Sequence, residues 1–395
     1  MNPQENPLLT GTNGGAAETA TAPAPASATP QFVFAREYGE RADEVNRFYN
    51  GFMGKNRSLE AYRWEFLHVP AGPCLMWTIT EVATQRVVGH HSIIPTPLVC
   101  RGADISGGRT ENTIVDPAVR HRIFYVGMEK KALAEALRSL RVIYTIHSKG
   151  PGALRLRLGY KPIGRWTVYL PKVGRDYLLA LFERGRKRLA PRVPDALLSL
   201  AAGLVARLHG LATGPTRSAP LDIQEISDLA EIALEYQSFW SRARREYDVT
   251  IDRSLEFLRW RIAENPHLRF QTWVLRRHGQ LAAVVIAHAH ALGDASALYI
   301  DDIIVGRYDD AEFEDVLACL PALDARVDTI VVMTLAVDTP LHRALRRRLP
   351  VQSRLLQYLG PRLFDEMLAL DRDAVAGPGP WYVTAVFTEG MDTSR

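Results

Sequence analysis

Apolar positions along the chain switch repeatedly between the spacing of a helix and the alternation of a strand. Helical spacing covers residues 41–53, and a second helix is expected to begin at Asn56. The first half then predicts three strands, a helix, a strand, a helix and a strand, at 75–81, 86–98, 105–115, 125–140, 142–146, 152–158 and 161–170. The second half repeats this order at 272–276, 281–288, 297–305, 311–320, 329–334, 341–348 and 381–387. The order indicates an α/β fold of the α+β kind, with a mixed sheet.

The two halves also share sequence. Residues 57–70 read RSLEAYRWEFLHVP and residues 253–266 read RSLEFLRWRIAENP, with seven of fourteen positions identical at an offset of 253 − 57 = 196. Trp77 falls on Trp273 at the same offset, and apolar positions in both segments repeat with helical spacing. Asn56 falls on Asp252, and either residue type can cap the start of a helix. We therefore expect two domains with one fold.

Composition narrows the class of protein. The chain has 395 residues and a net charge of +4, which gives no reason to expect DNA as a partner. Three cysteines are too few for a disulfide framework and lack the spacing of metal ligands, so we expect no metal and a cytoplasmic location. Residues 1–30 are rich in Ala, Thr and Pro and predict a disordered tail. No run of eighteen apolar residues predicts a membrane-spanning helix.

These patterns predict a tail at 1–30, a first domain at 31–172, a helical insert at 173–218 and a second domain at 219–395. The insert carries an apolar stripe and a basic run, followed by an amphipathic helix at 195–208. The simpler interpretation is a helical hairpin that packs on the domains and leaves its basic run in solvent. A basic amphipathic pair can also lie on an anionic membrane, so peripheral membrane contact through 175–208 is the alternative.

Three segments carry a resemblance to a known family: residues 57–70, the strand GGRTENTIVDPAVR at 107–120, and RLRLGY at 155–160. Together they resemble the GNAT acyltransferase superfamily, and most closely the tandem-domain N-acyltransferases associated with bacterial polysaccharide or natural-product genes. The resemblance implies two GNAT-like domains in tandem, joined by the helical insert. It also implies a V-shaped gap between the parallel strands 105–115 and 142–146, which holds the pantetheine of acetyl-CoA or another acyl-CoA as co-substrate.

A phosphate-binding loop is expected where the first of these strands ends. Pyrophosphate binds convergent backbone N–H groups at a helix N-terminus, and the loop at 118–124 precedes the predicted helix. Family members place small residues where this chain has His121 and Ile123. The expected cofactor-binding set is Ile114, Val115, Arg120, His121, Arg122, Ile123 and Phe124. The second half has Asp309 and Asp310 in its corresponding loop, and these would repel phosphate, so the first half is expected to be the active one.

The resemblance also places candidate catalytic residues. Glu111 is the expected general base, because relatives use a Glu on this strand; the alternative is a Glu paired with Arg109 or Arg122. His147 ends the next strand and could relay a proton or hold the acceptor, although a histidine there is also typical of an ordinary loop. His91 is expected in the cleft wall and Asp302, to which an offset of 191 carries Glu111, in the acceptor cleft.

The leading hypothesis is a GNAT-type N-acyltransferase. It would move an acetyl or other acyl group from CoA to a small amine, such as an amino sugar or an amino-acid-like molecule, held between the domains. The first alternative is a Fem-like transferase with aminoacyl-tRNA as donor, in which tRNA would be a partner and binding would depend on salt. The second alternative is a non-catalytic module that retains the GNAT fold.

Overall fold

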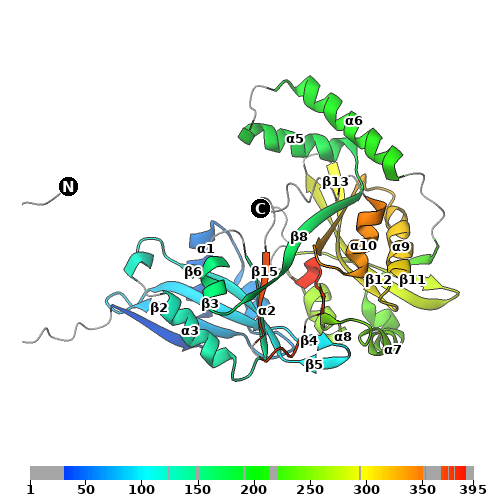
Figure 1. Cartoon of the computed structure of the whole chain (residues 1–395). Coiled ribbons are helices and arrows are strands. Elements are labelled where there is room, and N and C mark those ends of the chain that lie inside the picture. Colours follow the sequence, from blue (N-terminus) through cyan, green and yellow to red (C-terminus); the bar gives the residue numbers. More distant parts are fainter. Residues whose placement is uncertain are drawn as a thin grey trace, which may run out of the picture.

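The structure is a computed structural model. It describes residues 31–122, 125–147, 152–189, 193–213, 220–292, 295–349, 352, 366–371, 373–377 and 379–387. Within these residues the main sheet has twelve strands in the order β1-β2-β3-β6-β7-β15-β8-β14-β13-β12-β11-β9 (Figure 1). Their bounds are β1 Phe32–Glu37, β2 Leu75–Glu81, β3 Val87–Pro95, β6 Gly107–Val115, β7 Val142–His147, β8 Lys161–Lys172, β9 Asp222–Ile226, β11 Gln271–Arg277, β12 Gln280–Leu292, β13 Ala295–Val305, β14 Thr329–Leu335 and β15 Glu366–Asp371. The predicted mixed α/β fold is confirmed.

The two halves of the sheet exchange their closing strands. β15 comes from the end of the chain but lies between β7 and β8, antiparallel to both. β8 comes from the first half but pairs antiparallel with β14 of the second half. The sheet is therefore continuous across both halves, and the division of the chain into domains remains a prediction.

Helices cover both faces of the sheet, with similar elements in each half (Figure 1). Those of the first half are α1 Ala42–Met53, α2 Leu59–Phe66, η1 Arg120–Arg122, α3 Tyr125–Ala136 and α4 Gly152–Arg157. Those of the second half are η2 Leu229–Ile232, α7 Ala233–Ala243, α8 Leu255–Leu258, the π-helical turn η3 Arg259–Ala263, α9 Asp310–Cys319, η4 Leu320–Ala322, α10 Pro340–Arg348 and η5 Ala385–Phe387. In the sequence, two further helices lie between the halves: α5 Arg175–Leu189 and α6 Asp195–Thr213.

The duplicated segments meet each other at the centre of the molecule. The indole Nε1 of Trp64 donates to the carbonyl of Trp260 at 2.9 Å, and the indole Nε1 of Trp260 donates to the carbonyl of Trp64 at 3.1 Å. Both tryptophans are buried, as expected of residues that pack in a core. The expected caps were wrong by two residues: Ser58 and Ser254, not Asn56 and Asp252, accept the backbone N–H groups of the first turns.

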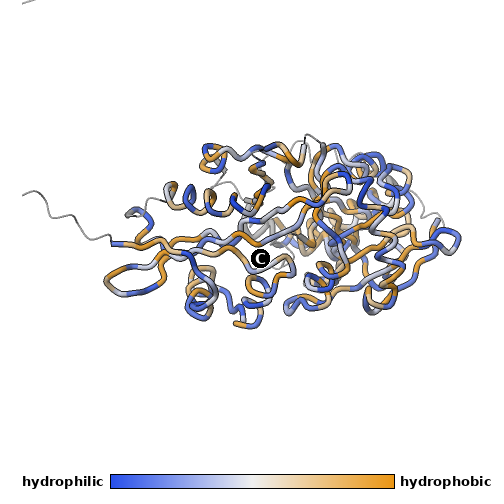
Figure 2. Tube along the Cα trace, turned by 90° about the horizontal axis from the view of Figure 1, so that it is seen from below, coloured by the Kyte–Doolittle hydropathy of each residue, from blue (hydrophilic) through white to orange (hydrophobic). Residues whose placement is uncertain are grey.

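A second sheet ties the halves together. It has four short strands in the order β16-β10-β4-β5, with bounds β16 Trp381–Tyr382, β10 Val249–Ile251, β4 Leu98–Cys100 and β5 Ala103–Ile105. The strand predicted at 381–387 is thus only two residues long and belongs to this sheet, not to the main one. Hydrophobic stretches concentrate inside the second half and hydrophilic ones at its margins (Figure 2). Among the described helices, none is both long and apolar enough to cross a membrane.

Candidate functional site

The parallel strands β6 and β7 separate part of the way along their length. They pair only at Gly107↔Val142, Gly108↔Ile143 and Arg109↔Tyr144. Beyond these pairs β6 stays bonded to β3 and β7 stays bonded to β15, and no described segment pairs with β6 on the side that faces β7. We name this region, residues 110–115 of β6 and 145–147 of β7, the first splay. It lies where the sequence predicted the V-shaped gap.

A β-bulge lies in the first splay. The register between β3 and β6 shifts between His90 and Ser92, so that His91 faces two residues of β6. Asn112 adopts the left-handed φ of 46° there, a conformation that Asn tolerates better than most residues. A bulge turns backbone groups out of the regular ladder. It is therefore a place from which a backbone N–H can reach a ligand in the splay.

Several buried polar atoms beside the bulge lack hydrogen-bond partners among the described residues. They are the hydroxyl of Thr110, the side-chain N–H₂ of Asn112, both ring nitrogens of His90 and Nε2 of His91. Buried polar groups in native proteins are nearly always paired, with protein, water or a ligand. Their concentration on β3 and β6 favours this region as a ligand site. Ile114 and Val115, which the sequence assigned to cofactor binding, lie two to three residues beyond Asn112; Asn112 was the residue it missed.

Glu111 lies on the α2 face of the sheet in a chain of buried charges. Its Oε2 is 3.1 Å from Nη2 of Arg109, which lies 4.0 Å from Oε1 of Glu65, and Glu65 in turn accepts from Arg57 at 2.9 Å. Glu111 and Arg109 are both buried. The structure therefore has the Arg109 pairing that was the structural alternative for Glu111. A role as general base remains a prediction.

On the opposite, α3 face, one buried arginine spans the first splay. The guanidinium of Arg155 on α4 bonds Thr145 of β7, donates to Thr113 of β6 at 3.3 Å, and reaches Glu129 of α3 at 3.4 Å. A cation with partners on both strands and a helix fixes how far the strands separate. Arg155 belongs to the RLRLGY segment, but sequence reasoning gave it no role. The signal that could have found it is an arginine inside an otherwise apolar helical stripe.

His91 lies on this same face. Its Nδ1 is 2.9 Å from the hydroxyl of Thr113, and its ring packs on Trp77 with centroids 5.7 Å apart. Burial, followed by the charges of Arg155 and His90, lowers the pKa of His91 to about 3. The residue is therefore a neutral, buried imidazole, and its expected contact with the acceptor remains a prediction.

The loop after β6 is ordered by Asp116. The carboxylate of Asp116 accepts from the N–H of Ala118 at 2.9 Å, and its carbonyl accepts from the N–H of Arg120 at 3.0 Å. Arg120 and His121 are exposed on η1, and α3 begins at Tyr125. Ile114 and Val115 are half-buried at the end of β6. Of the remaining expected site residues, Ile123 and Phe124 lie outside the described residues, as do the side chains of Arg122 and His147.

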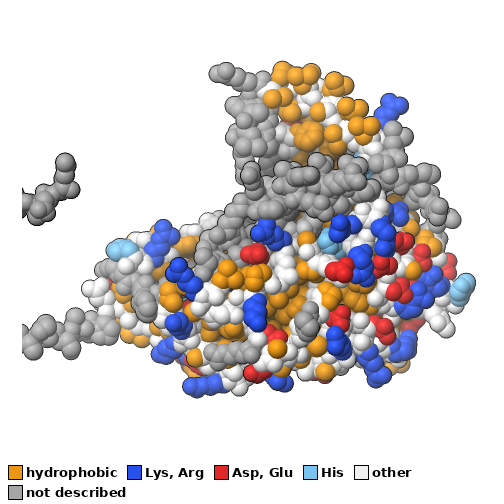
Figure 3. Space-filling view, viewed as in Figure 1, with side chains coloured by type: hydrophobic (Ala, Val, Ile, Leu, Met, Phe, Trp, Pro, Cys, Tyr) orange, Lys and Arg blue, Asp and Glu red, His pale blue; other side chains and the backbone are white. Residues whose placement is uncertain are grey.

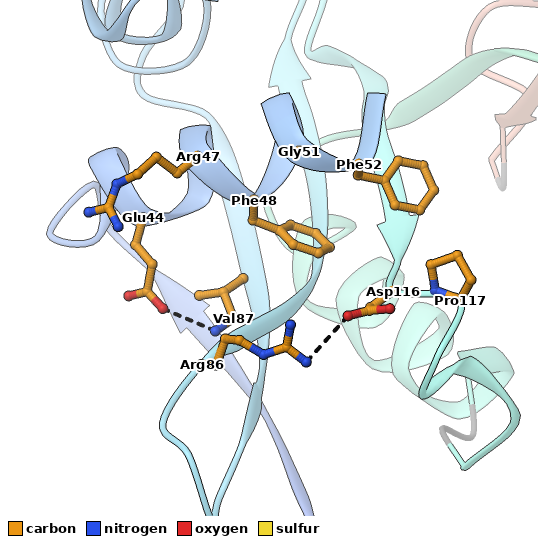
Figure 4. Close-up of a pocket in the computed structure, with 9 residues that line it drawn as sticks. All are labelled: Glu44, Arg47, Phe48, Gly51, Phe52, Arg86, Val87, Asp116 and Pro117. Atoms are coloured by element: carbon orange, nitrogen blue, oxygen red, sulfur yellow. Dashed lines mark hydrogen bonds and ion pairs between the residues drawn. The ribbon is translucent and has the colours of Figure 1, made fainter. Parts of the chain in front are cut away.

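A hollow of about 610 Å³ adjoins this loop, between α1 and the ends of β3 and β6 (Figure 4). Phe48 and Phe52 extend from α1 on one side of it. On the other side Arg86 pairs with Asp116 at 3.3 Å, and Glu44 of α1 accepts from the N–H of Val87 at 3.0 Å. The hollow therefore combines an aromatic wall with paired charges, next to the last residues of β6.

The second half contains the corresponding separation, and the chain fills it. β13 and β14 pair in parallel from Ala297↔Thr329 to Ile300↔Val332 and then part. We name residues 301–305 of β13 and 333–335 of β14 the second splay. Thr384 forms an antiparallel bridge with Thr334 on β14, and its hydroxyl donates to Asp302 on β13 at 2.8 Å. Thr384 of the C-terminal segment 381–387 thus lies between these strands.

Asp302, which accepts the hydrogen bond from Thr384, also pairs with a buried arginine. Nε of Arg253 donates to its Oδ2 at 2.8 Å and Nη2 donates to its Oδ1 at 3.2 Å, with both side chains fully buried. Asp302 therefore lies in the second splay, apart from Glu111 and the other expected site residues, with both oxygens occupied. Its expected role in holding the acceptor remains a prediction.

The neighbouring Asp301 of β13 is also buried. A bulge between Ile286 and Ala287 of β12 breaks the alternation there. Oδ2 of Asp301 is 2.6 Å from Nδ1 of His288, and the charge of Asp302 acts to raise the pKa of Asp301. Burial raises the pKa of Asp301 to about 6, although the hydrogen bond from His288 works against this rise.

No known protein family model matches the chain, and no curated protein matches it in sequence. Solved structures do match in fold. A GCN5-related N-acetyltransferase from Anabaena variabilis has a TM-score of 0.56 at 12% identity, over 86% of this chain and 72% of that one. N-myristoyltransferase from Saccharomyces cerevisiae with bound myristoyl-CoA has a TM-score of 0.53 at 12% identity, over 89% and 85%.

A probable N-acyltransferase from Enterococcus faecalis is a further match, with a TM-score of 0.57 at 10% identity, over 86% of this chain and 71% of that one. At these identities the likeness concerns the fold alone. The chain has the fold of GNAT-type acyltransferases, as its sequence led us to expect.

Proposed function

We propose that the protein is an acyl-CoA-dependent N-acyltransferase whose first splay binds the acyl-CoA. The observation that carries this proposal is the contrast between the two splays. Among the described residues, no segment pairs with the β7-facing edge of β6 beyond Arg109, and this stretch carries a bulge, whereas Thr384 of the chain's own C-terminal segment bridges the equivalent place in the second half. Residues 113–115 at the end of β6 are only partly buried.

The chemistry of pantetheine fits such an edge. Its extended chain contains two amides, which can bond to free N–H and C=O groups of β6 as an added strand would. The fold likeness supports the assignment, because one neighbour holds myristoyl-CoA. The pyrophosphate would then lie beyond Val115, near η1 and the start of α3, where Arg120 can contact phosphate oxygens.

The reaction is attack of an amine on the thioester carbonyl carbon. A C–N bond forms, the C–S bond breaks, CoA leaves as the thiolate, and the amine loses a proton. A backbone N–H at the Asn112 bulge polarises the carbonyl and stabilises its developing negative charge. Glu111, next to the bulge, accepts the proton, and Arg109 holds its carboxylate in place. The acceptor is a small amine such as an amino sugar or an amino-acid-like molecule, and the reaction takes place in the cytoplasm, where acyl-CoA is made and used.

Calorimetric titration of acetyl-CoA and of longer acyl-CoA thioesters tests the binding. We expect one site per chain, with unchanged affinity in Glu111→Gln. With an acceptor identified by mass spectrometry, Glu111→Gln should lower kcat by about 100-fold. Glu60→Gln, at an exposed position on α2, is the matched control and should leave kcat unchanged. Absence of binding at high ligand excess would overturn the proposal.

The two alternatives lead to different results. With aminoacyl-tRNA as donor, bulk tRNA would shift in a gel at low salt and much less at high salt, since phosphate contacts depend on ionic strength. In a non-catalytic module, Glu111→Gln would have no effect in cells in which deletion of the gene has one. Either result, together with no binding of acyl-CoA, would replace the proposal.

A further inference from the structure

The helical hairpin between β8 and β9 stands out from the body of the protein (Figure 1). α5 is anchored to the sheet: Tyr177 and Leu178 are buried, and the hydroxyl of Tyr177 bonds that of Tyr299 on β13 at 2.9 Å. α6 packs along α5, and its contact with β8 is slight. Of the two helices of the insert, α5 therefore packs on the body of the protein, as the simpler interpretation of the insert expected.

A helix that only packs on its own protein buries its large apolar residues. α6 instead exposes several of its large apolar residues and buries small ones. Among its described side chains Ala202 is buried, and Leu198, Gly203 and Ala206 are half-buried. Four of its leucines face outward at intervals of three, four and four residues, which form one stripe on a helix. They are Leu197, Leu200, Leu204 and Leu208, with 56%, 70%, 56% and 54% of their surfaces exposed. We name them the leucine row. Hydrophobic side chains gather over α6 at the top of Figure 3.

The charges of the hairpin favour one kind of partner. After Asp195, α6 has no acidic residue up to Thr213, and Arg207 is exposed beside the leucine row. α5 ends in a run with four basic residues. Over α5 and α6 together there are six basic residues, Arg175, Arg184, Arg186, Lys187, Arg188 and Arg207, and three acidic ones, Asp176, Glu183 and Asp195. An exposed apolar row, in a hairpin with more basic than acidic residues, complements an anionic lipid surface.

We propose that α6 docks on an anionic membrane surface, with the leucine row among the lipid chains and the basic residues among the phosphates. A second copy of the chain is the less favoured occupant, since pairing two such hairpins would bring their positive charges together. The proposal does not depend on acyl transfer.

Flotation of the full chain with lipid vesicles tests the proposal. We expect the protein to float with an equal mixture of phosphatidylcholine and phosphatidylglycerol, and much less with phosphatidylcholine alone. The double variant Leu200→Ser, Leu204→Ser should bind the mixed vesicles at least about tenfold more weakly. Leu234→Ser is the matched control, because this leucine of α7 is 82% exposed but stands away from the hairpin. Equal thermal melts establish that all variants are folded.

A second pair of variants tests the charges. Arg186→Ser with Lys187→Ser should weaken binding to mixed vesicles by about tenfold and leave the weak binding to neutral vesicles unchanged. The proposal is overturned if wild type does not float, or if the leucine variants float as well as wild type. It is also overturned if analytical ultracentrifugation shows a dimer that the leucine variants dissociate while vesicle binding is absent.

Discussion

The two splays have the same origin in the fold and different contents. In each half, two central parallel strands separate after the same position, Arg109 in β6 and Ile300 in β13, which differ by 300 − 109 = 191. The second splay holds the C-terminal segment through Thr334, Thr384 and Asp302. No described segment pairs across the first. Duplication of a fold thus supplies two equivalent places in the sheet, and this chain uses one of them for its own structure.

The two splays also differ in how completely their buried polar and charged groups are paired. The Arg253–Asp302 pair in the second splay is fully buried, and a further hydrogen bond from Thr384 completes it. The first splay instead has unsatisfied polar atoms at Thr110 and Asn112 among the described residues. Complete pairing is typical of a structural core, and incomplete pairing is typical of a site that receives a ligand. The difference indicates which half to examine for chemistry.

The largest expected effect is the loss of the buried ion pair in the second splay. Arg253→Leu leaves Asp302 buried without its cation, and we expect the free energy of unfolding to fall by about 3–5 kcal/mol. Arg101→Ala is the control: its pair with Asp248 is exposed, so the expected loss is below about 1 kcal/mol. Chemical denaturation measures both. Equal losses in the two variants would contradict a structural role for the second splay.

Acid should act on the first splay through its histidines. Burial, and then the charge of Arg57, lowers the pKa of His90 to about 3, and His91 is lowered similarly. Because the pKa of each histidine is lower in the folded protein than the ordinary 6.5, protonation favours the unfolded chain. The stability of the fold is therefore highest above pH 6.5 and falls as the pH is lowered toward 3. Each should cost about 2 kcal/mol at pH 5 relative to pH 7. Denaturation at the two pH values should show a smaller difference in His91→Asn than in wild type; an unchanged difference would contradict a buried, neutral His91.

A smaller effect is expected from the hydroxyl that joins the C-terminal segment to β13. Thr384→Val removes the hydrogen bond to Asp302 and an acceptor for Arg253, at a cost of about 2 kcal/mol in unfolding free energy. Thr384→Ser keeps the hydroxyl and should lose less. If valine and serine were equivalent, this bond would not hold the segment in the splay.

The smallest expected effect sharpens the role of the bulge. Asn112→Gly fits the left-handed conformation, whereas Asn112→Val places a β-branched residue where φ is 46°. We expect the valine variant to have about tenfold lower kcat/KM than the glycine variant, with acyl-CoA present in excess during the assay. Similar kinetics in both would mean that the bulge does not shape the reacting site.

Local sequence patterns anticipated much of the fold. The strands expected at 105–115 and 142–146 are β6 and β7, and they are parallel as predicted. The duplication was visible in the sequence, but the direct contact between Trp64 and Trp260 was not predicted. β15 was missed, and so was the exchange of β8 and β15, because strand order depends on pairing between distant parts of the chain and leaves no local signal. Of the strand expected at 381–387, Trp381 and Tyr382 pair with β10 in the second sheet, and Thr384 lies in the second splay.

The candidate site was less predictable. Sequence reasoning identified Glu111 and its neighbour Arg109, and the structure pairs them. It missed the bulge at Asn112 and the span of Arg155, because both arise from the register of β3 against β6 and from the docking of α4. It grouped Asp302 with Glu111 by position in the repeat, and the two are equivalent in place. Their surroundings differ, because the C-terminal segment occupies only the splay of Asp302 among the described residues.

Hydrogen–deuterium exchange with and without acyl-CoA tests the central claim most directly. We expect acyl-CoA to slow exchange in residues 110–115 of β6 and 145–147 of β7. Exchange in residues 301–305 of β13 and 333–335 of β14 should not change. Slower exchange in the second splay, or no change in the first at saturating acyl-CoA, would contradict the account.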